Sequence, residues 1–263
     1  MKRLPLVLLA LFLAAALPSR ADEWSKTYNL TGKPDLRVDT TDANIRVSTW
    51  DQNTIEARVT TTRYKIGPGG IQIDEHQNGD VVELKVRFPH HNFVIEFGTH
   101  KVEIEVRMPR EGRVDLHTGD GRIELANLKG EMELRTGDGS EEITGVEGKL
   151  HATTGDGHIR TNGRFDELEL KTGDGHIDAR ALAGSAVSTE WRLESGDGTV
   201  TLEVPENLAA DLELHTGDGH IDLEMPVTTS GKLRENEVRG KLNGGGNLLM
   251  IHTGDGSIRL RKG

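Results

Sequence analysis

The sequence predicts an all-β protein that folds as a β-solenoid, a single-stranded stack of coils of the right-handed β-helix type. A Gly-Asp-Gly tripeptide recurs seven times, with its Asp at positions 120, 138, 156, 174, 197, 218 and 255. The first four copies are 18 residues apart, and such a fixed period indicates stacked structural repeats. No stretch after residue 21 shows an apolar period of about 3.6 residues with caps, so we expect almost no helix.

Apolar and polar residues alternate before each tripeptide, which predicts a strand with one buried face entering each turn. Four positions before the Asp the chain carries Leu116, Leu134, Ala152, Leu170, Leu193, Leu214 and Ile251. We expect the first four of these to form one interior column. A second strand leaves the turn, because Ile or Val stands three positions after the Asp in every copy except one, where Glu141 takes that place.

The seven turns have a consistent composition, with Thr two positions before the Asp and Ser195 in its place once. Glycine on either side of the Asp suits a sharp reversal that needs either a positive φ or a close approach to the neighbouring coil. The Thr hydroxyl is placed to satisfy a buried turn amide. The predicted structural turns are Gly119-Asp120-Gly121, Gly137-Asp138-Gly139, Gly155-Asp156-Gly157, Gly173-Asp174-Gly175, Gly196-Asp197-Gly198, Gly217-Asp218-Gly219 and Gly254-Asp255-Gly256.

The N-terminal residues have the features of a secretory signal peptide. Lys2 and Arg3 precede an apolar run over residues 4–17, and the small residues Ser19 and Ala21 predict cleavage after Ala21. We therefore expect an exported protein of the periplasm, the cell surface or the medium, and not an integral membrane protein. Residues 22–263 carry a formal charge of −14, which makes nucleic acid an unlikely partner.

Residues 22–110 are predicted to form a β region with a degenerate copy of the repeat and several hairpins. The degenerate copy covers residues 36–47, where Thr41 and Ala43 replace the two turn glycines. Residues 111–263 are predicted to form the regular solenoid, with an excursion at 227–246 that caps or flanks the stack. The chain has no cysteine, so burial and hydrogen bonds must stabilise the fold without disulfides.

Together these repeats resemble the putative-adhesin family of β-strand repeats in bacterial envelope proteins. The resemblance rests on the pattern Leu-x-Val-x-Thr-x-Asp-x-x-Ile from Leu36 to Ile45, on the later Thr-Gly-Asp-Gly copies, and on the Gly-rich segment before residues 252–258. That family is classed as a domain of unknown function. The resemblance implies a β-solenoid with no established activity, no catalytic residues and no cofactor.

Two ladders of side chains raise the alternative of a metal-binding repeat protein. The turn aspartates place one carboxylate per coil at a spacing of about 4.8 Å, so neighbouring carboxylates repel each other. A bound calcium ion would relieve this repulsion. The opposite corner lacks the acids that complete calcium sites in nonapeptide solenoids. His158 and His176 stand two positions after the Asp in successive coils, with His220 in the same column, and could share zinc or copper. We predict that solvated turn residues account for both ladders, with no bound metal.

One cluster is a candidate interaction surface, comprising Phe88, His90, His91, Phe93, Phe97 and His100. A hairpin packed over the end of the solenoid would explain the same residues. A polysaccharide lyase or hydrolase is the enzymatic alternative, since β-helices host such enzymes with paired carboxylates on one face. Acidic residues recur in every coil here, so their positions do not identify a particular catalytic pair. The sequence therefore predicts a non-catalytic, adhesin-like binding or scaffold protein that contacts an envelope protein or polysaccharide.

Overall fold

The computed structural model describes residues 22–62, 64–89, 101–229 and 234–263. These residues form strands β1 to β21 and no helix, which confirms the all-β prediction. They accordingly include no helix with the length and hydrophobicity needed to cross a lipid bilayer. The predicted signal peptide, residues 1–21, lies outside the described residues.

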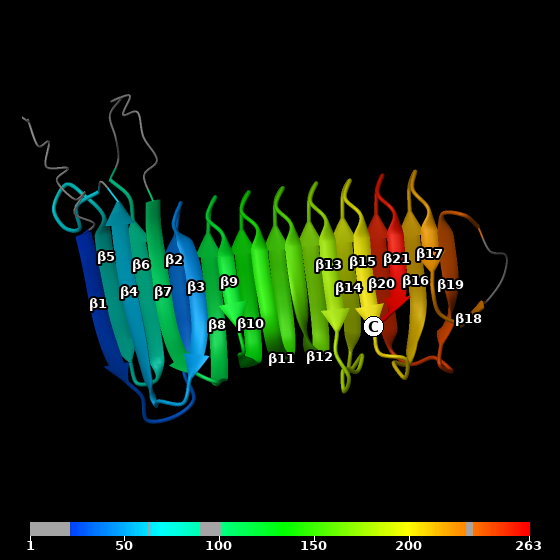
Figure 1. Ribbon diagram of the computed structural model, residues 1–263, viewed down its shortest axis with the longest axis horizontal. Helices are drawn as coiled ribbons and strands as arrows, with labels where there is room; N and C mark the ends of the chain where they lie inside the picture. Colours follow the sequence, from blue (N-terminus) through cyan, green and yellow to red (C-terminus); the bar gives the residue numbers. More distant parts are fainter. Residues whose placement is uncertain (1–21, 63, 90–100, 230–233) are drawn as a thin grey trace, which may run out of the picture.

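The strands that enter the Gly-Asp-Gly turns lie side by side and form one face of an elongated stack (Figure 1). Parallel pairing joins them in register along this face. In spatial order they are β2 (Asp35–Thr40), β8 (Glu111–Thr118), β10 (Lys129–Thr136), the second parts of β11 (Glu141–Thr154) and β12 (Ile159–Thr172), β14 (Glu190–Ser195), β20 (Leu248–Thr253) and β16 (Ala210–Thr216).

The strands that leave the turns form the second face, again by parallel pairing. They are β3 (Asn44–Trp50), β9 (Ile123–Ala126), the first parts of β11 and β12, β13 (Ile177–Ala181), β15 (Val200–Val204), β21 (Ile258–Lys262) and β17 (Ile221–Leu223). Strands β11 and β12 run continuously around the corner opposite the turns, with register shifts between Thr144 and Val146 and between Gly148 and Lys149. Each coil therefore contributes one rung to each face, as a two-faced solenoid requires.

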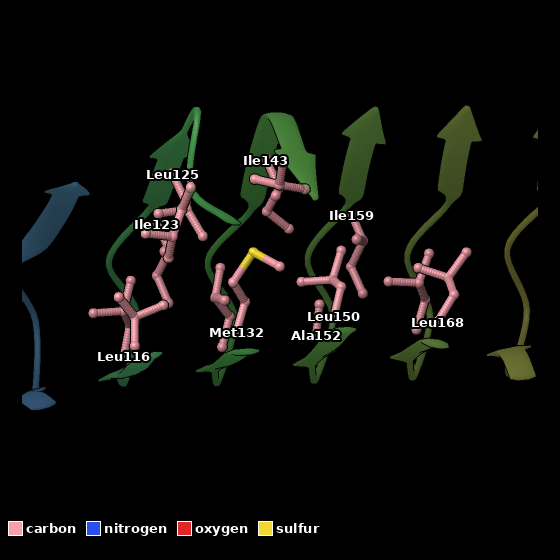
Figure 2. Packing of buried hydrophobic residues seen from close by; sticks show 14 of the residues in the cluster. Leu116, Ile123, Leu125, Met132, Ile143, Leu150, Ala152, Ile159 and Leu168 are labelled. Carbon is pink, nitrogen blue, oxygen red and sulfur yellow. The ribbon is translucent and has the colours of Figure 1, made fainter. Parts of the chain in front are cut away.

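Aliphatic side chains from the two faces meet between them and form a continuous core (Figure 2). Leu134 is the register partner of Leu116 on one side and of Ala152 on the other, and Ala152 is in turn the partner of Leu170. All four are almost completely buried. The predicted interior column is thus confirmed, and its repetition lets thin coils bury an apolar surface that no single coil could bury alone.

The coils do not stack in the order of the sequence. Strand β14 of the fifth copy pairs with β20 of the seventh, and β20 pairs with β16 of the sixth. On the other face β15 pairs with β21, which pairs with β17. The seventh coil therefore occupies the position between the fifth and the sixth, seen in Figure 1 as red strands between yellow and orange ones. We call the contacts of β20 with β14 and β16 the seam.

Both ends of the stack are extended by further strands. At the N-terminal end, β6 (Val81–Arg87) and β7 (Lys101–Pro109) pair in parallel with β2 and β3, and β5 (Gln72–Asn78), β4 (Thr54–Thr62) and β1 (Asp22–Asn29) continue the two faces by antiparallel pairing. At the other end, β19 (Glu237–Leu242) pairs antiparallel with β16, and β18 (Val227–Thr229) pairs with β19. The degenerate copy is thus enclosed on both sides. The domain boundaries at 110/111 and the right-handed sense of the coil stay predictions.

Engineered cysteine pairs test the seam directly, since the chain has no cysteine of its own. Arg192 is the register partner of Met250, which is the partner of Glu213. Neighbouring strands are about 4.8 Å apart and second neighbours about twice that, while a disulfide needs Cα atoms roughly 4.4 to 6.8 Å apart. We expect Arg192→Cys with Met250→Cys to oxidise to a disulfide, and Arg192→Cys with Glu213→Cys to stay reduced. Non-reducing peptide mapping distinguishes the two, and the opposite result would mean that the copies stack in sequence order.

Candidate functional site

The turn ladder is held by hydrogen bonds of the Thr side chains, as the sequence predicts. The amide of Gly139 donates to Thr136 Oγ1 at 3.1 Å, and the same hydroxyl lies 3.1 Å from the carbonyl oxygen of Gly121 in the preceding coil. Four further turns repeat this pair of bonds, through Thr154, Thr172, Ser195 and Thr216. Each hydroxyl thus links its own turn to a neighbouring coil.

The turn glycines are required by close backbone contact and not by a positive φ. None of the fourteen glycines in the seven turns has a positive φ, so of the two reasons considered for glycine the close approach is the one that applies. A Cβ added at Gly139 would overlap the carbonyl oxygen of Gly121, and one at Gly137 would lie 2.8 Å from that of Gly119. The amide of Gly137 also donates to the Gly119 carbonyl at 2.5 Å. Positive φ occurs instead at the opposite corner, as at Gly130 (141°) and Gly148 (115°).

Glu141 occupies the interior position that Ile or Val holds in the other copies. Its residue is 1% exposed, and its register partners on either side are Ile123 and Ile159. Neither carboxylate oxygen has a hydrogen-bond partner among the described residues. Burial raises the pKa of the Glu141 carboxyl well above its ordinary value of 4.5, because a charge in this apolar setting would be unsolvated. The carboxyl cannot reach a substrate outside the core.

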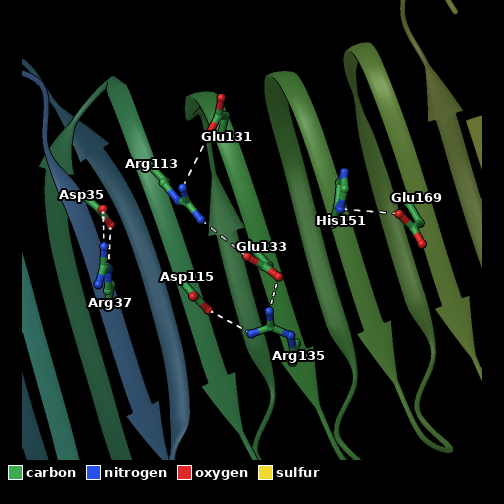
Figure 3. Close-up of polar contacts among 9 residues, drawn as sticks. All are labelled: Asp35, Arg37, Arg113, Asp115, Glu131, Glu133, Arg135, His151 and Glu169. Atoms are coloured by element: carbon green, nitrogen blue, oxygen red, sulfur yellow. Dashed lines mark hydrogen bonds and ion pairs between the residues drawn. The ribbon is translucent and has the colours of Figure 1, made fainter. Parts of the chain in front are cut away.

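The outward side chains of the regular coils form rows of ion pairs, several of which Figure 3 shows. Arg135 pairs with Asp115 of the preceding coil at 3.2 Å and with Glu133 of its own strand. Arg113 lies 3.7 Å from Glu133, and His151 lies 3.5 Å from Glu169. Such exposed pairs each contribute about 0 to 1 kcal/mol, so they make the face polar more than they stabilise it.

The turn aspartates project along one edge of the stack, and their backbone amides join the ladder. The amide of Asp138, for example, lies 3.2 Å from the carbonyl oxygen of Gly119. At the end of this ladder the pKa of Asp42 is raised, mainly by partial burial and further by the nearby Asp120. The backbones of the turn aspartates therefore follow one edge of the stack.

His158 and His176 are neighbours in one column, as predicted, and one nitrogen of each ring already accepts a hydrogen bond. The rings of His158 and His176 are stacked, with centroids 5.1 Å apart. His158 Nδ1 accepts the amide of His176 at 3.0 Å, and His176 Nδ1 accepts the amide of Thr199 at 2.9 Å. His220 lies beside Ser257 at 3.0 Å, because the seventh coil and not the fourth or fifth is its neighbour. The imidazoles of His158 and His176 therefore serve as acceptors between coils.

The aromatic cluster is described only at its first residue. Phe88 is partly buried against the core and makes an edge-to-face contact with Tyr64, with ring centroids 5.9 Å apart. His90, His91, Phe93, Phe97 and His100 lie outside the described residues. The interaction surface therefore stays a prediction, and Phe88 packs inward.

A hollow at the seam brings together residues that the sequence separates widely. It has a volume of about 380 Å³, and its lining includes Glu194, His215, Glu237 and His252. These side chains come from β14, β16, β19 and β20. The repeats taken in sequence order do not bring these residues together, because the order of strands decides which residues become neighbours. The 37-residue gap between the sixth and seventh Asp was the one available sign of a rearrangement.

Residues 110–197 match the family model of the Toastrack domain, DUF4097. This segment is a Toastrack domain. The match spans the first four Gly-Asp-Gly copies, ends at Asp197 of the fifth, and confirms the resemblance found in the repeats. It assigns no activity to the chain, since the function of this domain family is unknown.

Several solved structures have a similar outline. One is a "putative cell adhesion protein" from Clostridium sporogenes, with 14% sequence identity, coverage of 93% of this chain and 100% of that chain, and a TM-score of 0.46. A "putative adhesin" from Bacteroides fragilis has 14% identity, coverage of 91% of this chain and 97% of that chain, and a TM-score of 0.49. A "putative adhesin" from Parabacteroides merdae has 15% identity, coverage of 92% of this chain and 97% of that chain, and a TM-score of 0.46. Similarities at this level carry no argument about the present chain. No curated protein is a significant match.

The close contact at the turns predicts a large effect from a single added methyl group. Gly139→Ala should lower the free energy of unfolding by about 1 to 3 kcal/mol, because its Cβ would overlap the Gly121 carbonyl and the coils must separate. Arg135→Gln in the same coil removes only exposed ion pairs and should cost less than about 1 kcal/mol. Urea unfolding of the two variants measures the difference, and equal stabilities would contradict a structural role for the glycine.

The buried carboxyl predicts a specific dependence of stability on pH. The folded chain holds the Glu141 proton more tightly than the unfolded chain, so this residue lowers stability as pH rises above 4.5 towards the folded-state pKa. Glu141→Gln keeps the shape without the charge and should stabilise the protein by an amount that grows with pH over this range, up to about 1 to 3 kcal/mol.

Glu142→Gln is the matched control, because the neighbouring side chain is 46% exposed and pairs with Arg122. Thermal unfolding between pH 4 and 8 would separate the two variants. A Glu141→Gln curve parallel to that of the unsubstituted protein would show that the carboxyl is ionised or solvated in the folded state.

Proposed function

We propose that this protein is a non-catalytic, exported β-solenoid that binds a macromolecule of the bacterial envelope or serves there as a scaffold. The observation that carries the proposal is the regularity of the outer surface. On the two faces of the regular coils, many outward acids are paired with Arg or Lys of the same or a neighbouring coil, as with Arg135, Arg113 and Lys149. A surface built of repeated rows of paired charges suits contact over a long area.

Enzymes that act on polysaccharides need unlike groups that converge on one bond, with at least one carboxyl of suitably raised pKa. The strongly perturbed carboxyl in the described residues belongs to Glu141, which faces the core. The paired acids of the faces are tied to basic side chains at 2.7 to 3.9 Å, as at Arg46, Lys149 and Arg160. These arrangements favour binding over hydrolysis or elimination.

Two features of the sequence support the location. The basic, apolar and small-residue segments of positions 1–21 have the order of an export signal, and the remainder is acidic, at −14. The chain has no cysteine, so a fold stabilised by coil stacking does not depend on the redox state of the compartment and is compatible with export. A protein or polysaccharide of the envelope is therefore the partner that we propose.

A capture experiment tests this function. Residues 22–263, immobilised, should retain a component of an envelope extract or of a polysaccharide panel, and should leave the bound glycan uncleaved. Phe93→Ser with Phe97→Ser should abolish capture with an unchanged melting temperature if the predicted aromatic cluster forms the contact, while Arg135→Gln should keep it. Turnover of a glycan that is lost on one carboxylate substitution would establish the enzymatic alternative instead.

A further inference from the structure

Four potential metal ligands form one row across the seam. Glu194 of β14 is the register partner of His252 of β20, which is the partner of His215 of β16. His215 is in turn the partner of Glu237 of β19. The row therefore reads Glu-His-His-Glu across four adjacent strands, and it exists only because the seventh coil lies between the fifth and the sixth.

The two imidazoles at the centre of this row are exposed and available. Their rings are stacked, with centroids 5.2 Å apart and planes 15° apart. In the described part of the chain, the ring nitrogens of His215 and His252 have no hydrogen-bond or ion-pair partner. The stacked pair His158 and His176 differs in this respect, because each Nδ1 accepts a backbone amide. The seam pair is therefore free to turn its rings towards a ligand.

The surroundings of the pair are hollow and carry both acidic and basic side chains. The rings border the 380 Å³ hollow, whose lining also includes Glu213, Arg239 and Met250. Glu194 is 3.2 Å from Arg192 and 3.7 Å from Lys171, and Glu237 is 2.9 Å from Arg234 and 3.3 Å from Arg239. Both carboxylates are partly exposed, at 27%, so either can exchange a basic partner for another cation.

We propose that His215 and His252 bind a divalent transition-metal ion, with a carboxylate from an end of the row, Glu194 or Glu237, as a third ligand. Imidazole nitrogen selects zinc, copper and nickel over calcium or magnesium, which take oxygen ligands. Zinc with Zn–N bonds of about 2.0 to 2.1 Å holds two nitrogens roughly 3.4 Å apart in tetrahedral geometry. The rings must therefore converge by rotation about χ1 and χ2.

That rotation is needed because no three His, Asp or Glu side chains of the described residues meet in metal-binding geometry as they stand. The ion would draw the two rings together and displace one arginine from its carboxylate. Metal binding would then link β16 to β20 and could extend to β14 or β19, fastening the coil that is out of sequence order. This inference is independent of the proposed binding to an envelope partner.

Titration of the untagged chain, residues 22–263, with ZnCl₂ in a calorimeter tests the site. We expect one saturable site, and at least roughly tenfold weaker binding in His215→Ala and in His252→Ala. His117→Ala is the matched control, since His117 is exposed in the same outward position and its register neighbours are Asp39 and Arg135. It should leave the affinity unchanged.

Two further measurements keep the test decisive. Nitrogen-15 NMR of the imidazoles should show zinc-dependent shifts at His215 and His252 and none at His117, and equal melting temperatures of the metal-free variants would show that the substitutions leave the fold intact. His176→Ala should retain the site. No saturable zinc binding by the unsubstituted chain, or the same affinity in all variants, would overturn the proposal.

Discussion

The backbone of each turn lies so close to the turn of a neighbouring coil that no Cβ fits between them, and this contact organises the molecule. It fixes the coil spacing at the one corner where all coils are alike, and the Thr hydroxyls reinforce it from inside. With that spacing set, equivalent residues of successive coils fall into line, and both the apolar columns and the outward ion pairs follow. The opposite corner has no such contact in every coil, and its sequence and length vary accordingly.

Much of this architecture could be predicted from the sequence, because the relevant constraints are local. The alternation around Leu116 and Leu134 determines which face is buried, and the turn glycines mark the reversals. Glu141 could be recognised as an exception from the repeat alone. Its environment could be specified only when Ile123 and Ile159 were seen on either side of it. The repeat alone could not tell which property of glycine the turns use, because a positive φ and a close backbone approach select the same residue.

The order of the coils could not be predicted, for a physical reason. Every coil presents similar strand edges and similar apolar columns, so a coil can dock on any other if the connecting chain is long enough. The local pattern around Ile251 does not distinguish contact with Leu193 and Leu214 from contact with Leu214 alone. The length of the connecting chain and the total apolar surface that each stacking order buries decide between these arrangements. The row containing His215 and His252 depends on that decision, and it was therefore invisible in the repeats.

The displaced seventh coil also has a consequence for synthesis. A chain that emerges N-terminal end first, from a ribosome or through an export channel, can add its first five regular coils one after another. The edges of β14 and β15 then lack their partners until residues 248–262 have emerged. The sixth coil, although made earlier, lacks its native neighbour until the same moment. Completion of this end is therefore a single late event, and until it occurs the growing chain presents open strand edges to chaperones, proteases and other chains.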